Sequence, residues 1–297
     1  MNNKKLNLKN DIIFKAFFGK KGNEEFLIDF LEALLKIKIT KIEIQEDVNL
    51  EQLSVEEKGG RLDIQAILND GVIANIEMQV RNNHNMEVRT TFYASKIMSR
   101  ETSRGEDYRS IKKIILINIL GYNMFKKYDE YIHKTAIVLD GHRDEIVIDN
   151  IEWWFIELPK FRKMHKNIDN KIEQWLLFID DEEKELVKMA EEKNQTLQKA
   201  REKMNYLTGD AAVRRLAELR EIWELDYNSD INYAREKGEK SGLKRGRKEG
   251  RAEGRAEGKK EEKKEIAKKL LKLQMPIEQI SEITSLTGDE IKNIDID

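Results

Sequence analysis

The stretch RLDIQAILNDGVIANIEMQV, residues 61–80, decides the fold because apolar and polar residues alternate on both sides of a short turn. A period of two is typical of β-strands. The connector Asn69-Asp70-Gly71 suits a three-residue hairpin loop, with a type I turn on Asn69 and Asp70 followed by Gly71 at positive φ. We therefore predict two antiparallel strands joined by this loop.

The loop also predicts which residues face each other. Pairing Leu68 with Val72 makes one face of the ribbon apolar throughout, and a single buried face disfavours any slip from this register. On the other face Asp63 then lies opposite Glu77, with Cβ atoms roughly 4.5–5.5 Å apart. Two such carboxylates repel unless a cation or a proton lies between them. The pattern alone leaves two interpretations: a solvated face whose charges are tolerated, or a cation site.

Composition narrows the class of protein. The 297 residues are 39% hydrophobic, which is enough for a substantial core, and the formal net charge of -2 does not identify a partner. The chain has no Cys, which excludes disulfides and thiolate metal sites, and its four histidines show no HxxxH spacing. No apolar run reaches the length of a membrane span, and the first residues lack the apolar core of a secretory signal. We therefore expect a cytoplasmic protein.

Hydrophobic periodicity predicts the elements around the hairpin. Helices are expected over residues 11–36, divided at Gly19, and over 85–103, closed by Gly105; strands are expected over 39–50, 111–120, 131–140 and 145–157. The Ile-rich run 111–120 is typical of an interior strand covered on both faces. Beyond residue 169 only helices are expected, with a break near Thr208-Gly209. This order predicts an α/β core followed by an α-helical C-terminal region.

Glycines recur every four residues between Gly238 and Gly258, and residues 235–272 carry sixteen Lys or Arg against eight Glu. A four-residue step exceeds a helical turn by about 40°, and each glycine costs a helix about 1 kcal/mol. The segment should therefore form a helix against a partner or stay flexible. Its positive charge could contact phosphates; a solvated linker or an oligomerisation helix fits as well.

The last segment, residues 266–294, has three short apolar-periodic pieces broken at Met275-Pro276 and Thr287-Gly288. This pattern resembles a small helix-turn-helix unit. Asp289 and Glu290 at the start of its last helix disfavour reading of a DNA groove.

The polar face of the hairpin, with Asp63, thirteen intervening residues and then Glu77-x-Gln79, resembles the PD-(D/E)XK nuclease superfamily. More narrowly, the chain is similar to the Rpn family of recombination-promoting nucleases and putative transposases. The likeness is carried by NDIIFKAFFG (10–19), LIDFLEALL (27–35), the hairpin (61–80), RTTFYASKI (89–97), GEDYRSIKKIILINIL (105–120) and the Gly-rich tail with SEITSLTGDEI (281–291). The resemblance implies a restriction-endonuclease-like core, with a mixed sheet flanked by helices, and a metal-dependent DNA endonuclease.

The resemblance also implies the site residues. Asp63 and Glu77 would hold Mg²⁺ together with the backbone carbonyl of Met78, with Mn²⁺ or Ca²⁺ as alternatives, because hard cations prefer oxygen ligands. The ion would lower the pKa of a bound water and neutralise developing charge.

One position departs from the superfamily pattern: Gln79 stands where Lys is more usual. Glutamine cannot supply a positive charge. Either Gln79 suffices or a cation comes from elsewhere, and Lys96 is our candidate, on the same helix face as Arg89, Tyr93 and Arg100. Asp11 matches the opening segment of the family, and we expect it to cap the first helix rather than to act in catalysis.

We predict four regions: a PD-(D/E)XK-like nuclease core over 1–165, a helical segment over 166–230, a basic Gly-repeat helix or linker over 231–262, and a small helical unit over 263–297. DNA is the expected partner, and the C-terminal helical region is expected to form a homo-oligomer. The alternative is a non-enzymatic oligomeric protein that binds DNA or another partner and carries a decayed nuclease site.

Overall fold

The computed structural model describes residues 6–45, 64–69, 71–101 and 107–295. The chain divides into two compact units, Met1–Glu224 and Leu225–Asp297. The elements are α1 (Asp11–Phe18), α2 (Glu24–Leu35), β1 (Ile42–Ile44), β2 (Ile64–Leu68), β3 (Val72–Gln79), α3 (Met86–Arg100), η2 (Tyr108–Ser110), β4 (Ile114–Leu120), β5 (Ile132–Leu139), β6 (His142–Glu157), α4 (Leu158–Lys163), α5 (Lys171–Asp180), α6 (Lys184–Lys193), α7 (Gln195–Gly209), α8 (Ala211–Lys272), α9 (Ile277–Thr284) and α10 (Gly288–Lys292).

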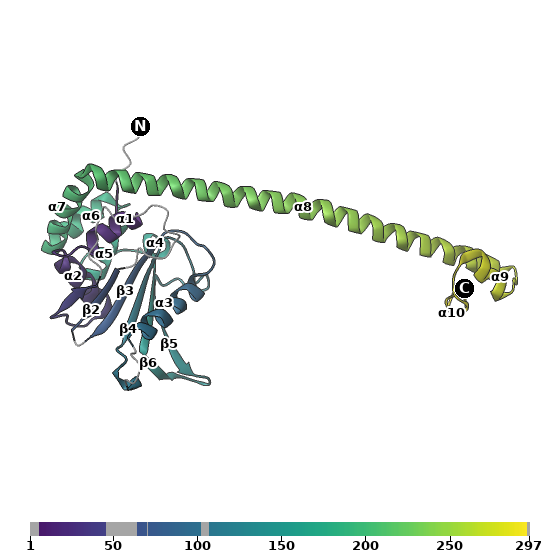
Figure 1. Cartoon of the computed structure of the whole chain (residues 1–297), viewed down its shortest axis with the longest axis horizontal. Coiled ribbons are helices and arrows are strands. Elements are labelled where there is room, and N and C mark those ends of the chain that lie inside the picture. The colour runs from purple at the N-terminus through teal and green to yellow at the C-terminus, as the bar shows by residue number, and fades with distance from the viewer. Residues whose placement is uncertain (1–5, 46–63, 70, 102–106, 296–297) are drawn as a thin grey trace. The chain divides into compact units, whose positions relative to one another are not determined.

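The first unit is built on a mixed sheet whose described strands follow the order β1-β2-β3-β4-β6-β5 (Figure 1). Strands β1, β2 and β3 are antiparallel, β4 runs parallel to both β3 and β6, and β5 returns antiparallel to β6. All seven residues of β4 are buried, which confirms the predicted interior strand. The α/β fold with a mixed, helix-flanked sheet is therefore as the sequence predicts.

The central hairpin has the predicted register. Leu68 pairs with Val72 and Ile64 with Ile76, and Gly71 has a φ of +103°. The predicted type I turn is wrong, because Asn69 has a φ of +43°. The side chain of Asn69 accepts a hydrogen bond from the Thr40 backbone N–H at 2.8 Å and donates one to the Lys38 carbonyl at 2.8 Å, so the segment before β1 holds this residue.

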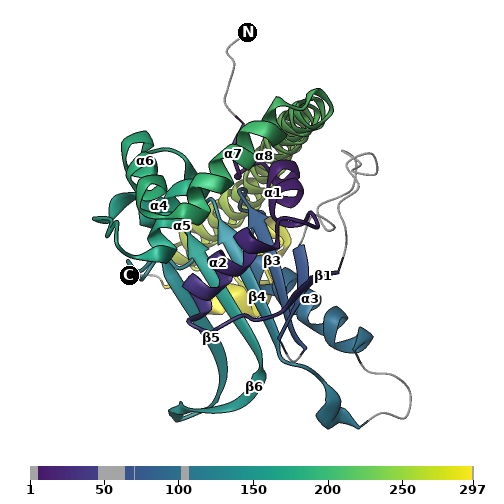
Figure 2. The same cartoon turned by 90° about the vertical axis from the view of Figure 1, so that its left-hand side faces the viewer.

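Both faces of the sheet are covered by helices (Figure 2). One face, with Ile76, Met78 and Ile117, packs in the main core with α1, α2 and α5. The other face, which contains Ile73 and Leu116, packs against α3. The six residues of β3 from Ile73 to Met78 are consequently all buried. The polar face of the hairpin is therefore not the solvated surface that alternation alone permits.

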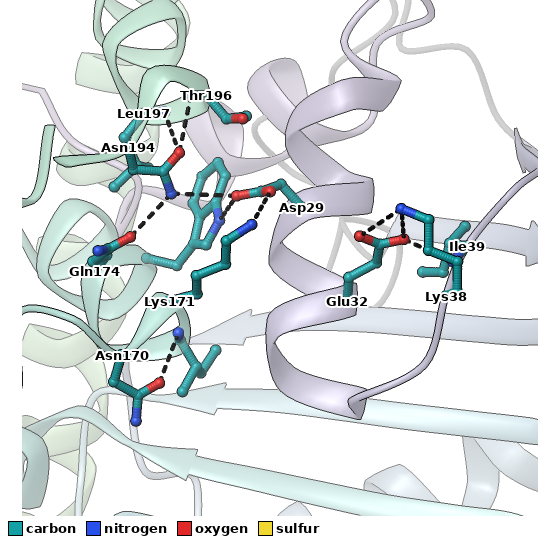
Figure 3. A network of polar contacts seen from close by, with 12 residues as sticks. Asp29, Glu32, Lys38, Ile39, Asn170, Lys171, Gln174, Asn194, Thr196 and Leu197 are labelled. Atoms are coloured by element: carbon teal, nitrogen blue, oxygen red, sulfur yellow. Dashed lines mark hydrogen bonds and ion pairs between the residues drawn. The ribbon is translucent and has the colours of Figure 1, made fainter.

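A polar network fastens the helices of the main core to one another (Figure 3). The carboxylate of Asp29 on α2 accepts hydrogen bonds from Trp175 Nε1 on α5 at 2.9 Å and from Asn194 Nδ2 at 3.3 Å. Asn194 also donates to Gln174 at 3.1 Å and caps α7 through the Thr196 N–H. Trp175 is fully buried. This network fixes the helical layer that supports the sheet from one side.

The first helix is capped by Asn10, whose side chain accepts hydrogen bonds from the N–H groups of Ile12 and Ile13. The prediction that Asp11 is the cap was wrong, because Asp11 is the first helical residue. Its carboxylate instead pairs with Arg220 of α8, with 2.7 Å between Oδ2 and Nη2. The beginning of α8 is thus attached to α1.

In the second unit, α8 continues as a helix through the glycine repeat. A Cβ added at any repeat position from Gly238 to Gly258 would meet no atom within 4 Å, so nothing in the described chain packs against that stripe. Ion pairs four residues apart, Arg235–Glu239 and Glu236–Lys240, support the helix on its surface.

The predicted breaks near Pro276 and Gly288 are confirmed, because α9 follows the first and α10 the second. The end of α8, α9 and α10 bury a small apolar cluster that includes Ile280 and Ile291. Glu290 forms a capping box with Thr287. No helix in the described parts of the chain is both long enough and apolar enough to cross a membrane.

Candidate functional site

Glu77 is a buried carboxylate near the carboxyl end of β3, on the face that α3 covers. Only 3% of the residue is exposed. Arg89, in the first turn of α3, forms an ion pair with it through Nη2 and Oε1, and the Arg89 side chain is itself 16% exposed. The guanidinium also lies over the ring of Tyr93, 5.4 Å from its centroid. A charge this deep in a protein requires a partner, and α3 supplies one.

Asn118 of β4 stands beside Glu77 in the parallel register. It is 2% exposed in a strand that is otherwise apolar. Its amide donates hydrogen bonds to the Trp154 carbonyl at 3.2 Å and to Thr90 Oγ1 of α3 at 3.4 Å. The residue therefore joins β4, β6 and α3 next to the buried carboxylate.

The loop after β4 brings Tyr122 to the same region. Burial, with the negative charges of Glu77 and Glu87, raises the pKa of Tyr122 to about 12. At neutral pH its hydroxyl stays protonated and can donate a hydrogen bond. The loop approaches β3 closely, because a Cβ at Gly121 would lie 2.7 Å from the carbonyl oxygen of Val80.

Glu157, at the end of β6, anchors the following part of this loop. It is fully buried and accepts hydrogen bonds from the backbone N–H groups of Met124 and Phe125. Lys160 balances its charge at 2.5 Å. The carboxyl ends of the three parallel strands are in this way held by polar contacts.

The remaining residues predicted for β3 follow the strand alternation. Gln79 is half-buried, and its Nε2 donates to the Arg81 carbonyl at 3.0 Å. Arg81 in turn pairs with Glu224 of α8 at 2.9 Å. The Met78 side chain belongs to the apolar core on the opposite face, so only its backbone could serve as a ligand.

Lys96 and Asp63 are the two other site residues that the sequence predicts. Lys96 is exposed on α3, and the cation that the structure brings to Glu77 is Arg89. Asp63 lies outside the described residues, so the predicted pairing of Asp63 with Glu77 remains a prediction. The predicted Gly105 helix end lies outside them as well.

The described residues supply one buried carboxylate to a metal site. Over the described ranges, no three His, Asp or Glu side chains are grouped as metal ligands. The buried oxygens of Glu77 suit a hard cation. A complete Mg²⁺ site there requires a further acidic group, and Asp63 has the chemistry to provide it.

Sequence reasoning missed Asn118, Tyr122 and Glu157 as members of this region. Asn118 offered a signal, because it interrupts the apolar run IILINIL. Tyr122 lies just after β4 and Glu157 ends β6, but only the parallel order of β3, β4 and β6 brings these strand ends together.

The model of a family described as PD-(D/E)XK nuclease family transposase matches residues 8–234. No curated protein and no solved structure matched the chain.

Proposed function

The chain belongs to the PD-(D/E)XK nuclease family transposases, and from this premise we propose that it is a divalent-metal-dependent endonuclease that hydrolyses phosphodiester bonds in DNA. The observation that carries the proposal is Glu77, a carboxylate buried at the carboxyl end of a central strand and paired with an arginine. The matched residues include that strand, α3 and the whole sheet. Recombination or transposition is the setting that this family suggests for the cleavage.

In the proposed site Asp63, Glu77 and the backbone carbonyl of Met78 would hold Mg²⁺, and Mn²⁺ or Ca²⁺ would fit the same oxygen ligands. The register supports this assignment, since Ile64 pairs with Ile76 and one further step of the same pairing would join Asp63 to Glu77. When bound, the metal supplies Lewis acidity that activates water and neutralises charge on the phosphate.

Arg89 supplies the positive charge that Gln79 lacks. Its guanidinium contacts Glu77, whereas Lys96 is exposed on the same helix. A guanidinium binds phosphate oxygens with two parallel hydrogen bonds, so Arg89, which neutralises Glu77 in this structure, would also suit contact with the scissile phosphate. Gln79 orients a water molecule through its amide. Lys96 remains the alternative cation.

The α8 segment from Arg235 to Lys272 is the proposed non-specific contact to DNA. Its excess of eight positive charges can neutralise phosphates. The same segment is our candidate for self-association, because a helix with six exposed glycines allows a second helix to approach its backbone closely.

A second function is favoured by Gln79 and by the glycine stripe. In this alternative the protein is a non-enzymatic oligomer that binds DNA or another partner, and its nuclease site has decayed. Metal binding separates the two proposals, because a decayed site has no carboxylate-dependent affinity for Mg²⁺ or Mn²⁺.

A plasmid-nicking assay tests the enzymatic proposal. We expect the wild type to nick supercoiled DNA with Mg²⁺ or Mn²⁺, and Glu77→Gln and Asp63→Asn to lose this activity. Glu43→Gln is the matched control, because Glu43 is an exposed strand residue on β1 and its substitution should leave cleavage unchanged. Undiminished cleavage by Glu77→Gln would contradict the assignment of Glu77 to the nuclease site.

A further inference from the structure

The distal part of the β5–β6 hairpin, residues 136–149, projects from the sheet edge as a two-stranded arm (Figure 2). Every arm residue whose burial is described is exposed. Six large aliphatic side chains are among them, each with 38–56% of its surface accessible: Ile137, Val138, Leu139, Ile146, Val147 and Ile148.

The sequence of the arm does not suit a ribbon that is exposed to solvent on both faces. Each strand carries three consecutive aliphatic residues, Ile137-Val138-Leu139 and Ile146-Val147-Ile148, so both faces of the ribbon are apolar. A strand with one solvated face would alternate with polar residues. A two-stranded ribbon alone is marginally stable, and an exposed apolar edge strand is a site for association. The arm therefore requires a covering surface.

The charges of the arm indicate what kind of surface that is. Its tip carries Asp140, Asp144 and Glu145 against the single arginine Arg143, so DNA is a poor partner. Its base carries both signs of charge, because Lys113 and Lys134 both contact the one carboxylate of Glu152, at 2.5 and 3.0 Å, and Asp149 lies at the same end of the arm. A partner that complements the arm should be apolar, with a cation facing the acidic tip.

We propose that the arm is covered by the same arm of a second copy of this chain, related by a two-fold axis. When two β5 strands run antiparallel about Ile137, Lys134 of each copy lies opposite Asp140 of the other. An acidic residue at the tip of each arm thus meets a lysine at the base of its partner, and the aliphatic residues of the two β5 strands lie side by side. Such an interface is self-complementary, as two-fold symmetry demands.

The proposed contact runs along the free edge of β5. The pairing of β5 with β6 shifts register three times between Thr135 and Leu139. The extra residues at these shifts lie in β6, so they do not interrupt the free edge of β5. The proposal is independent of the nuclease assignment and of association through α8.

Cross-linking of the full chain tests the proposal. The protein has no Cys, so Ile137→Cys introduces a single thiol next to the two-fold axis, and a short bismaleimide should convert most of it to a covalent dimer. Tyr206→Cys is the matched control, because Tyr206 is 78% exposed on α7, away from the arm in sequence and fold. It should give little dimer. Equal cross-linking of the two variants, or none of Ile137→Cys, would overturn the proposal.

Sedimentation of the full chain provides the second readout. Val147→Asp places a charge in the apolar contact at a position that is 56% exposed, so the fold tolerates it. We expect it to raise the dissociation constant of the arm-mediated dimer by about tenfold or more. The same assembly mass and the same dissociation constant as the wild type would contradict the proposal.

Discussion

Replacing Arg89 by Met tests the buried ion pair directly, because Met keeps much of the length of the side chain and removes its charge. The Glu77 side chain is 4% exposed and that of Arg89 is 16% exposed. Removal of one partner leaves the other charge buried without this counterion, which typically costs about 3–5 kcal/mol. For a unit of 224 residues, a loss of this size lowers the melting temperature by about 6–20 °C.

The measurement is calorimetric or urea unfolding of the wild type, Arg89→Met and the double variant Glu77→Gln/Arg89→Met. The double variant removes both charges and should recover most of the loss, because no uncompensated charge remains. Arg109→Met is the control: Arg109 pairs with Asp107 on the surface, with 91% of its side chain exposed, and its replacement should not change the melting temperature measurably. Equal melting temperatures for Arg89→Met and the wild type would refute this reasoning.

Three further predictions concern other parts of the molecule. Gly121→Ala should lower the free energy of unfolding by about 1–3 kcal/mol in urea, because its Cβ would lie 2.7 Å from the Val80 carbonyl oxygen; unchanged stability would contradict that close approach. The pKa of Tyr122 is raised to about 12 from 10.0. The buried, protonated phenol therefore stabilises the fold fully below pH 10, and this stabilisation is lost between about pH 10 and 12. Unfolding measured across that range should show a weaker alkaline loss of stability in Tyr122→Phe than in the wild type, and an identical loss would contradict the raised pKa of Tyr122. Truncation before Arg235 should lower the oligomeric mass in light scattering, and an unchanged mass would exclude association through the glycine repeat.

The sequence predicts the central hairpin well because two constraints agree there. Strand alternation selects one register, and the three-residue loop selects the same one, so the pairing of Leu68 with Val72 follows from both. The buried strand β4 is equally clear, because its apolar run leaves no face for water. Local pattern and global fold coincide at these elements.

The site is less predictable because it depends on contacts between elements. Helical spacing places Arg89 and Lys96 on one face of α3, yet Arg89 reaches Glu77 while Lys96 stays exposed. Lys96 lies seven residues, or about 10 Å, further along α3 than Arg89. Periodicity gives the helix face but not which turn of the helix lies beside Glu77. The prediction of the α1 cap was wrong by one residue, because Asn10 and Asp11 are adjacent and both residue types favour the cap position.

The glycine repeat shows that helix propensity alone does not predict where a helix forms. Six glycines in a charged segment weaken a helix, yet α8 runs through all of them. The segment satisfies its backbone hydrogen bonds within the helix, and the surface ion pairs add support. The stripe of exposed glycines is then a property of the helix surface that the sequence does predict.

The central claim is that Glu77 holds a catalytic divalent metal, and calorimetric titration with Mn²⁺ tests it most directly. The wild type and Glu43→Gln should bind Mn²⁺ with the same affinity and stoichiometry, and Glu77→Gln should lose this binding. Arg89→Met should bind Mn²⁺ at least as tightly as the wild type, because the cation that shares the Glu77 carboxylate is gone. Wild-type affinity in Glu77→Gln would contradict the account.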